Sequence, residues 1–265
     1  MKVTLLTNNT DAAKALAVSM LSQGLDLDRM VVVASREPSL RDRLVKSVRG
    51  ELSKIKQLIT LDSTTGKTLR FERRCATNAQ KHLKRFIGQY DFKKISHIPT
   101  KVFSSINHPQ LLEEFKHTPP ETCMVYGTGI IKENLLQLAK KAFVNAHCSI
   151  LPDYRGTRSE FWQCFHDDFD SLGVTIHLVN SGVDTGELLK QIPLTNVEYF
   201  DPDWLRVSNT INIIEEFPKI VKAFIEGKII PTAQDRATHT RAYRFKDITL
   251  EKRLTVYERI RKQRK

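Results

Sequence analysis

The 265-residue sequence lacks the features that mark disulfide-rich, metal-binding and membrane-spanning proteins. Its four cysteines lie 16 to 48 residues apart, without a Cys-x-x-Cys pair, so neither a disulfide scaffold nor a zinc site is indicated. No apolar run approaches the roughly 20 residues that span a bilayer. The N-terminus turns polar at Thr7, before the apolar core of a signal peptide could form. We therefore expect a cytoplasmic protein with no metal ion and no membrane contact.

Acidic residues are outnumbered by basic residues mainly in two segments of the chain. The chain has 42 Lys and Arg residues against 30 Asp and Glu residues, a net charge of +12. Residues 36–94 contain 16 basic and 6 acidic side chains, and residues 241–265 contain 10 and 3, whereas the rest of the chain sums to −5. A basic excess of this size raises the question of a nucleic acid or another anionic partner. Because the excess belongs to two segments, it does not characterise the whole chain.

Hydrophobic periodicity divides the chain into alternating strands and helices. Hydrophobic residues make up 40% and charged residues 27% of the sequence, proportions that exclude a disordered or fibrous protein. The patterns predict strands over residues 3–7, 30–34, 94–98, 123–126, 143–147, 174–179 and 188–192. They predict helices over residues 11–23, 40–59, 71–86, 109–115, 130–138, 160–165 and 201–226.

This alternation predicts an α/β fold, with a Rossmann-like, mostly parallel sheet and helices on both faces. We expect one catalytic domain over residues 1–230, with a basic, mostly helical insertion at 36–94 after the second strand. A short basic C-terminal extension covers residues 231–265. For the basic helices the simplest expectation is a solvated face, and for residues 257–265 a frayed helix end.

Polar side chains collect where three of the predicted strands end. Ligands of an open parallel sheet bind beyond the carboxyl ends of its strands. Asn145 and His147 lie two residues apart at such an end, so both side chains project from the same face. Asp184 lies between Gly182 and Gly186, in a turn whose glycines allow the backbone to approach a ligand closely. Asp184 is therefore a candidate partner for His147. The loops concerned span residues 126–131, 145–156 and 180–186.

Three separated blocks carry a resemblance to a known family. They are Asn145-Ala146-His147-Cys148-Ser149-Ile150-Leu151-Pro152-Asp153-Tyr154-Arg155-Gly156, then Gly173-Val174-Thr175-Ile176-His177, then Val183-Asp184-Thr185-Gly186. In this order they resemble the folate-dependent formyltransferases, the formyl_trans_N family, which includes the glycinamide ribonucleotide transformylases and the sugar N-formyltransferases. The resemblance covers residues 95–195 well and the opening strand, helix and strand loosely.

The resemblance implies a Rossmann-like catalytic domain that transfers a formyl group from 10-formyltetrahydrofolate to a primary amine. By position, the catalytic residues would be Asn145, His147 and Asp184. The folate would lie against Tyr126, Thr128, Gly129, Ile130, Ile131, Ser181, Gly182 and Val183. The acceptor would contact Ser149, Tyr154, Arg155, Gly156 and Arg158. Two positions depart from the family pattern: Gly129 stands where an arginine is common, and Cys148 stands where a proline is common.

Other polar and aromatic residues have less specific interpretations. Arg155 and Arg158 flank the predicted catalytic loop, and a guanidinium suits an anionic acceptor, although solvated loop arginines fit as well. His166 and His177 are isolated, so we interpret them as structural. Phe161 and its neighbour Trp162 are interpreted as a helix face that packs on the sheet.

The resemblance leaves the acceptor open among three amines. A nucleotide-linked amino sugar is our choice, because sugar N-formyltransferases vary most outside the core, where this chain has its basic segments. Methionyl-tRNA formyltransferases resemble a two-domain design, whereas only about forty residues follow the long helix at 201–226. Glycinamide ribonucleotide transformylases resemble a compact domain without a basic insertion. A hypothesis of another class is a non-catalytic nucleic-acid-binding protein on the same scaffold. A homodimer is a further possibility.

Overall fold

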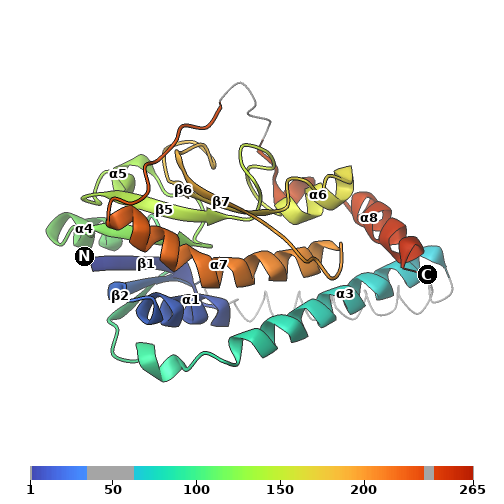
Figure 1. Cartoon of the computed structure of the whole chain (residues 1–265), viewed down its shortest axis with the longest axis horizontal. Coiled ribbons are helices and arrows are strands. Elements are labelled where there is room, and N and C mark those ends of the chain that lie inside the picture. The colour runs from blue at the N-terminus through green and yellow to red at the C-terminus, as the bar shows by residue number, and fades with distance from the viewer. Residues whose placement is uncertain (1, 35–62, 236–241, 265) are drawn as a thin grey trace.

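The computed structural model describes residues 2–34, 63–235 and 242–264 (Figure 1). Its strands are β1 (Lys2–Asn8), β2 (Asp26–Val33), β3 (Thr100–Phe103), β4 (Thr122–Tyr126), β5 (Ala142–His147), β6 (Gly173–Leu178) and β7 (Leu188–Pro193). Its α-helices are α1 (Asp11–Ser22), α3 (Thr64–Ile87), α4 (Pro109–His117), α5 (Glu133–Leu136), α6 (Ser159–His166), α7 (Pro202–Ile225) and α8 (Leu250–Gln263). Two short 3₁₀ helices are η1 (Phe92–Ile95) and η3 (Phe245–Asp247).

The strands form one seven-stranded sheet in the order β3-β2-β1-β4-β5-β6-β7. The neighbours from β3 to β5 are parallel, whereas β6 and β7 are antiparallel to their neighbours. The predicted α/β fold with a mostly parallel, Rossmann-like sheet is therefore confirmed. The carboxyl ends of β1, β4 and β5 lie at the same edge of the sheet, as predicted for the loops 126–131 and 145–156. The same prediction is wrong for the loop 180–186, because β6 is antiparallel to β5 and its carboxyl end lies at the other edge.

Alternate residues of the central strands are buried on opposite faces of the sheet. Leu5 packs with residues of α1 and α7, whereas the next residue, Leu6, packs with residues of α4 and α5. Met124 and Val125 of β4 divide in the same way. In Figure 1, α7 crosses in front of the sheet and α1 lies beside it, while α4 and α5 lie at the other side. Helices on both faces explain why these strands are apolar on both sides.

The strand predicted over residues 94–98 is wrong. Residues 92–95 form η1, which begins where the side chain of Asp91 accepts a hydrogen bond from the N–H of Lys93 at 3.0 Å. The edge strand is β3, residues 100–103, which pairs with β2. Val102 in this strand is 63% exposed, so β3 lacks the apolar alternation that would reveal it in the sequence.

The described part of the basic insertion is mainly one long helix. The helix predicted over residues 71–86 exists and is longer than expected, since α3 begins at Thr64, after the capping side chain of Ser63. It packs against α7 and α8 through its small buried residues Cys75 and Ala79. The helix predicted over residues 40–59 lies outside the described residues.

The expectation of a frayed C-terminal helix is wrong. Helix α8 packs against α3 and α6, and its Val256, Tyr257 and Ile260 are 0 to 5% exposed. Arg253 binds both carboxylate oxygens of Glu72 on α3, with its Nη2 2.8 Å from each. In Figure 1, α8 lies at the far end of α3, beside the C-terminus. The apolar stripe of α8 therefore completes a core, while several of its basic residues bind partners on neighbouring elements, such as Glu72 on α3.

Removing one hydroxyl group should weaken this contact measurably. Tyr257 donates a hydrogen bond to Asp203 at 2.6 Å between the two oxygens, and its side chain is buried. Tyr257→Phe leaves that carboxylate without its donor, so we expect the free energy of unfolding in urea to fall by about 1–3 kcal/mol. Tyr199→Phe, whose residue is 37% exposed, is the control and should change it by less than about 0.5 kcal/mol. Equal effects would contradict this role of the hydroxyl.

Candidate active site

The candidate site forms where β5 and β6 run side by side. These strands are antiparallel, and their register places Asn145 opposite His177 and His147 opposite Thr175. The turn between β6 and β7 then brings Asp184 over the same face. Three side chains that are far apart in the sequence, Asn145, His147 and Asp184, are thus brought together as predicted.

The carboxylate of Asp184 lies between two imidazole rings. Its Oδ2 is 3.5 Å from Nδ1 of His147, and its Oδ1 is 3.6 Å from Nε2 of His177. The backbone N–H of Gly156 donates a hydrogen bond to Oδ2 at 2.8 Å. Both histidines are at most 6% exposed, so these contacts are shielded from water and stronger than at a surface.

His147 has a polar partner at each ring nitrogen. Nε2 lies 3.0 Å from the carbonyl oxygen of Tyr154, which can only accept a hydrogen bond. Nδ1 faces the Asp184 carboxylate. A ring that carries both protons satisfies both contacts at once. The hydroxyl of Ser159 lies 3.3 Å from the same Nε2 and donates to the carbonyl oxygen of Tyr154 at 2.9 Å.

The surroundings of Asp184 favour its charged form. Burial on its own would raise the pKa of this carboxyl group, but His147, His177 and the Gly156 N–H together outweigh burial and hold the pKa well below its ordinary value. The carboxylate is therefore ionised at neutral pH. In that form it orients the His147 ring and stabilises positive charge on it.

This pKa shift predicts a pH dependence of stability. Because the pKa of Asp184 is lower in the folded than in the unfolded chain, its stabilising effect is complete above the unfolded value of about 4 and is lost as the pH falls below it. We expect the free energy of unfolding of Asp184→Asn, measured in urea from pH 7 to pH 3, to fall less steeply below pH 4 than that of the wild type. Parallel curves would contradict the assignment.

His177 is a functional candidate that the sequence interpretation set aside as structural. Its Nδ1 donates to the carbonyl oxygen of Leu178 at 2.8 Å, which leaves Nε2 to accept from Nδ2 of Asn145 at 3.1 Å. The ring therefore fixes the orientation of the Asn145 amide, whose second N–H is directed by this contact. The signal for it was the register of β5 against β6, which is a tertiary property.

The turn at residues 182–186 is shaped by close backbone contacts. Asp184 has φ +52°, in the left-handed region that few non-glycine residues adopt. A Cβ atom at Gly186 would collide with the carbonyl group of Leu178, so only glycine fits there. Nη1 of Arg155 donates to the carbonyl oxygen of Val183 at 3.2 Å and links this turn to the loop after β5.

The predicted folate-binding residues lie on two loops, one that follows β4 and one that joins β6 to β7. Ile130 is 72% exposed and Val183 37% exposed, so both offer apolar surface, and Ser181 and Gly182 are exposed beside Val183. Ile131 differs, since its side chain packs in the core with residues of α4 and α5. Its contact with a ligand would come from the backbone. Of the other residues in this set, Tyr126 is the last residue of β4 and packs against the core that contains Leu5, whereas Thr128 and Gly129 lie between β4 and α5.

The predicted acceptor-binding residues divide into buried and accessible ones. Ser149 is buried, and its hydroxyl donates to the carbonyl oxygen of Asp153 at 2.9 Å. Tyr154 is also buried and stacks on Tyr243, so only the backbone of these two residues is available to a ligand. Arg158 is exposed, and its guanidinium lies 5.2 Å from the centre of the Phe245 ring. Arg155 and Gly156 contact the Asp184 turn, as described above.

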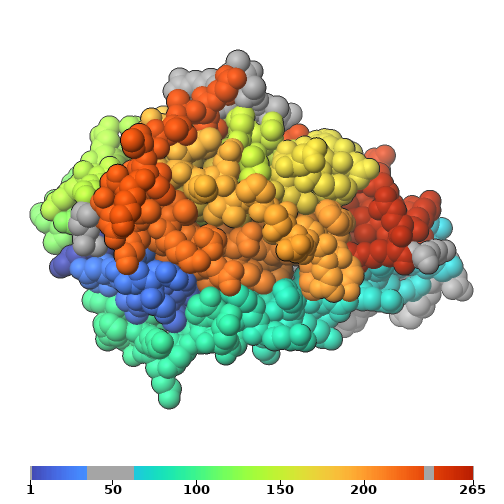
Figure 2. Space-filling view, viewed as in Figure 1, coloured from blue at the N-terminus to red at the C-terminus, as the bar shows by residue number. Residues whose placement is uncertain are grey.

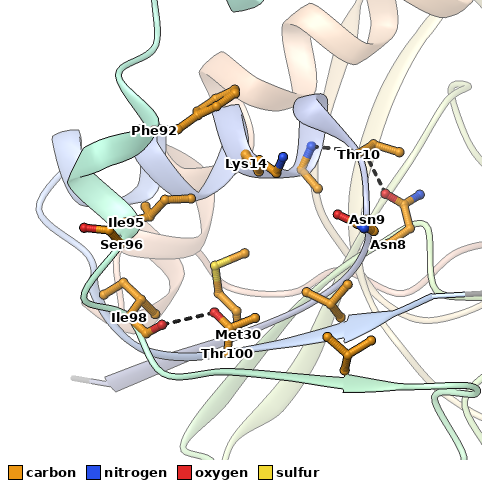
Figure 3. Close-up of a pocket in the computed structure, with 13 residues that line it drawn as sticks. Asn8, Asn9, Thr10, Lys14, Met30, Phe92, Ile95, Ser96, Ile98 and Thr100 are labelled. Atoms are coloured by element: carbon orange, nitrogen blue, oxygen red, sulfur yellow. Dashed lines mark hydrogen bonds between the residues drawn. The ribbon is translucent and has the colours of Figure 1, made fainter.

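A cavity of about 470 Å³ lies on the α1 side of the sheet, away from these residues. Figure 3 shows Phe92 and Ile95 of η1 on one side of it, Met30 and Thr100 on the other, and Asn8 to Thr10 at its end. The sequence interpretation did not identify it.

Within the described residues, no cluster of three His, Cys, Asp or Glu side chains has the arrangement of a metal site. No helix in the same ranges has the length and apolar character that a bilayer span needs.

Comparison with known proteins assigns the family. The family model described as Formyl transferase matches residues 1–198, which contain the whole candidate site. The chain belongs to this family. The resemblance drawn from the three sequence blocks is thereby confirmed, and the match also includes the whole basic insertion at 36–94.

Individual relatives cover smaller parts of this chain. It is 32% identical over 129 residues to the methionyl-tRNA formyltransferase of Caldanaerobacter subterraneus subsp. tengcongensis, covering 48% of this chain and 41% of that protein. The methionyl-tRNA formyltransferase of Trichlorobacter lovleyi is 30% identical over 141 residues, 52% of this chain and 44% of that protein. The chain thus spans less than half the length of the curated relatives it matches.

Two solved structures share the fold over nearly all of this chain. Glycinamide ribonucleotide transformylase 1 from Symbiobacterium toebii has a TM-score of 0.54 and 15% identity, covering 89% of this chain and 94% of that chain. The N-formyltransferase from Helicobacter canadensis, solved with folinic acid and dTDP-3-aminofucose, has a TM-score of 0.54 and 14% identity, covering all of this chain and 83% of that one. At this identity the likeness shows the fold alone.

Proposed function

We propose that this formyl transferase family member transfers a formyl group from 10-formyltetrahydrofolate to a primary amine. One observation carries the proposal: the Asp184 carboxylate lies 3.5 Å from Nδ1 of His147, with Asn145 on the same strand end. An amide donor, an imidazole and an ionised carboxylate are the groups that such a transfer needs. Family membership supports the same reaction.

The reaction forms one bond and breaks one. The nitrogen of the amine bonds to the formyl carbon, and the bond from that carbon to N10 of the folate breaks. During attack, negative charge develops on the formyl oxygen, and the amine nitrogen becomes positive and must lose a proton. That proton ends on N10 of the departing tetrahydrofolate, so no oxidant or further co-reactant is required.

The three side chains of the site match these demands. The Asn145 amide, held by His177, donates a hydrogen bond where negative charge develops. For His147 to act, its Nε2 exchanges the carbonyl oxygen of Tyr154 for the reactants. The protonated ring then stabilises the same oxygen, and the neutral ring accepts the proton of the amine. Asp184 holds the ring of His147 and stabilises its positive charge. Each side chain acts without a covalent intermediate on the protein.

Two loops are suited to hold the folate. The exposed aliphatic side chains of Ile130 and Val183 lie on the loops 126–131 and 181–184, which follow β4 and β6. A Cβ atom added at Gly129 would meet nothing within 4 Å, so the first loop is open at that position. The pterin ring of the folate is flat and has hydrogen-bonding groups at its edges, so it fits between aliphatic side chains and polar backbone groups. When bound, the co-substrate supplies the formyl group.

We propose a nucleotide-linked amino sugar as the acceptor. The N-formyltransferase of Helicobacter canadensis, which shares the fold, was solved with such a sugar, dTDP-3-aminofucose. In this chain the exposed Arg158 and the 63% exposed Phe245 offer a cation and an aromatic ring, which suit a phosphate and a base. A cytoplasmic location belongs to the same proposal and rests on the four free thiols.

Methionyl-tRNA is the second candidate acceptor. The curated relatives at 30 to 32% identity carry that name, and α3 exposes a row of basic side chains that an RNA backbone would attract. The sequence relatives and the fold relatives thus favour different amines, and glycinamide ribonucleotide is the third.

One acceptor panel tests the proposal. The protein is incubated with 10-formyltetrahydrofolate and, in separate reactions, a set of nucleotide-linked amino sugars, glycinamide ribonucleotide or methionyl-tRNA. Mass spectrometry of each acceptor is expected to show a formyl adduct with a sugar nucleotide and release of tetrahydrofolate only in that reaction. A formyl adduct on methionyl-tRNA alone would refute the sugar as acceptor and would still support formyl transfer. Absence of turnover with every amine would refute formyl transfer.

A further inference from the structure

The segment that follows α7 reaches back to the candidate site. Thr232 pairs with Leu188 in an antiparallel bridge, with N–H to oxygen contacts of 2.9 and 2.7 Å between nitrogen and oxygen. Residues 231–235 therefore lie beside the beginning of β7, directly after the Asp184 turn. In Figure 1 this segment rises from the end of α7 past the sheet, and Figure 2 shows it in orange-red on the outside of the molecule.

Within this segment, the side chain of Gln234 points inward. It is 8% exposed, and its Nε2 donates to the carbonyl oxygen of Asp184 at 3.0 Å and to that of Gly186 at 2.6 Å. Its two N–H groups thus hold both ends of a three-residue turn. Its Oε1 is buried and has no hydrogen-bond partner among the described residues. A buried carbonyl without a partner destabilises the folded state, so filling space does not account for an amide here.

The turn that Gln234 holds is one that needs outside support. Asp184 has φ +52°, which is unfavourable for a residue with a Cβ atom and persists only when the surroundings enforce it. The carbonyl groups on either side of Thr185 are directed toward Gln234, whereas the carboxylate of Asp184 is directed toward His147 and Gly156. The direction of the Asp184 carboxylate therefore depends on the hydrogen bonds that Gln234 makes to the backbone of the same turn.

We propose that Gln234 is a positioning residue for Asp184. It touches neither His147 nor the reacting groups, and it acts by fixing the turn from which the Asp184 carboxylate reaches the His147 ring. The effect of Gln234 on catalysis rests on the proposed function, whereas its effect on the orientation of the Asp184 carboxylate holds whatever the reaction is.

A second contact of the C-terminal extension supports the same geometry. The N–H of Tyr243 donates to the carbonyl oxygen of Arg155 at 2.8 Å, and the carbonyl of Tyr243 accepts from the N–H of Thr157 at 3.0 Å. These bonds hold Gly156 between them, and the N–H of Gly156 is the donor to Oδ2 of Asp184. Both protein segments that fix the carboxylate are thus held by residues of the extension, which makes it part of the site rather than an appendage.

The test replaces the amide by an apolar group of similar length. Gln234→Met removes both donors, so we expect kcat for formyl transfer to fall by about 10- to 100-fold, because a small displacement of a reacting group is costly. The KM values for 10-formyltetrahydrofolate and for the acceptor should change less than about twofold, since Gln234 contacts neither. Gln234→Asn keeps the donors on a shorter side chain and should restore part of kcat. Thr232→Val, on an exposed side chain of the same segment, is the control and should behave as wild type.

A titration tests the proposal independently of activity. In the wild type, ¹³C NMR should show a pKa for Asp184 below its ordinary value, and in Gln234→Met this pKa should move up toward that value. The other titratable or charged groups near the carboxylate are His147, His177, the Cys148 thiol and Arg155. A variant with wild-type kcat overturns the proposal. If the wild type transfers no formyl group to any acceptor, the proposed function fails, and an unchanged Asp184 titration then overturns the positioning role as well.

Discussion

His147→Ala is expected to lower kcat for formyl transfer by about 10²–10⁴-fold, the usual contribution of a general acid–base residue. The ring is the only titratable group placed, among the described residues, both on the Asp184 carboxylate and at the end of β5 beside Asn145. Without it, neither the developing charge on oxygen nor the proton of the amine has this imidazole as a partner. Steady-state rates from pH 5 to pH 9 give the measurement.

The control for this variant is an exposed histidine outside the site. His97 lies in the turn before β3, and His97→Ala should retain the wild-type rate. Circular dichroism and urea unfolding establish that both variants fold, which is needed because His147 is only 6% exposed. A folded His147→Ala protein with a wild-type rate would refute the catalytic assignment.

Asn145→Ala should lower kcat by about 10²–10³-fold, the effect of removing one donor to a developing oxyanion. The loss should be in kcat more than in KM, because this hydrogen bond strengthens as charge develops and is weak in the ground state. His177→Ala should reproduce a smaller part of the same loss, since His177 orients the Asn145 amide at 3.1 Å and also contacts the Asp184 carboxylate at 3.6 Å. The additional loss in Asn145→Ala therefore measures the contribution of the donor itself.

Asn78→Ala is the matched control for the asparagine, since Asn78 is exposed on α3. It should leave kcat and KM unchanged. If Asn145→Ala raised KM and left kcat unaltered, the amide would bind the ground state only, and the proposed stabilisation of charge would be incorrect.

The sequence was informative wherever a local periodicity carries the information. Asn145 and His147 could be placed on one face because side chains alternate along any strand. Asp184 could be recognised as a turn residue because glycines stand on both sides of it. The prediction failed for β3, where an exposed edge strand of four residues has no apolar alternation, and where the neighbouring Asp91 begins a 3₁₀ helix instead.

Contacts between distant segments account for the residues that were missed or misread. His177 became a partner of Asn145 only through the antiparallel register of β5 and β6. Gln234 follows Asp184 by 50 residues, and a single amide in a polar segment has no pattern that would mark it. Residues 257–265 were expected to form a frayed helix end, because the stripe formed by Val256 and Ile260 is short and its partner surface on α3 is not visible in the sequence.

The chain's fold class, its family and the three residues of its candidate site followed from the sequence, since each depends on residues that are close together or on motifs in a given order. The distances at Asp184, the roles of His177 and Gln234 and the packing of α8 required the folded chain. The physical reason is the range of the interactions. Strand alternation and turn chemistry act over a few residues, whereas an ion pair or a hydrogen bond across loops exists only after folding has brought its partners together.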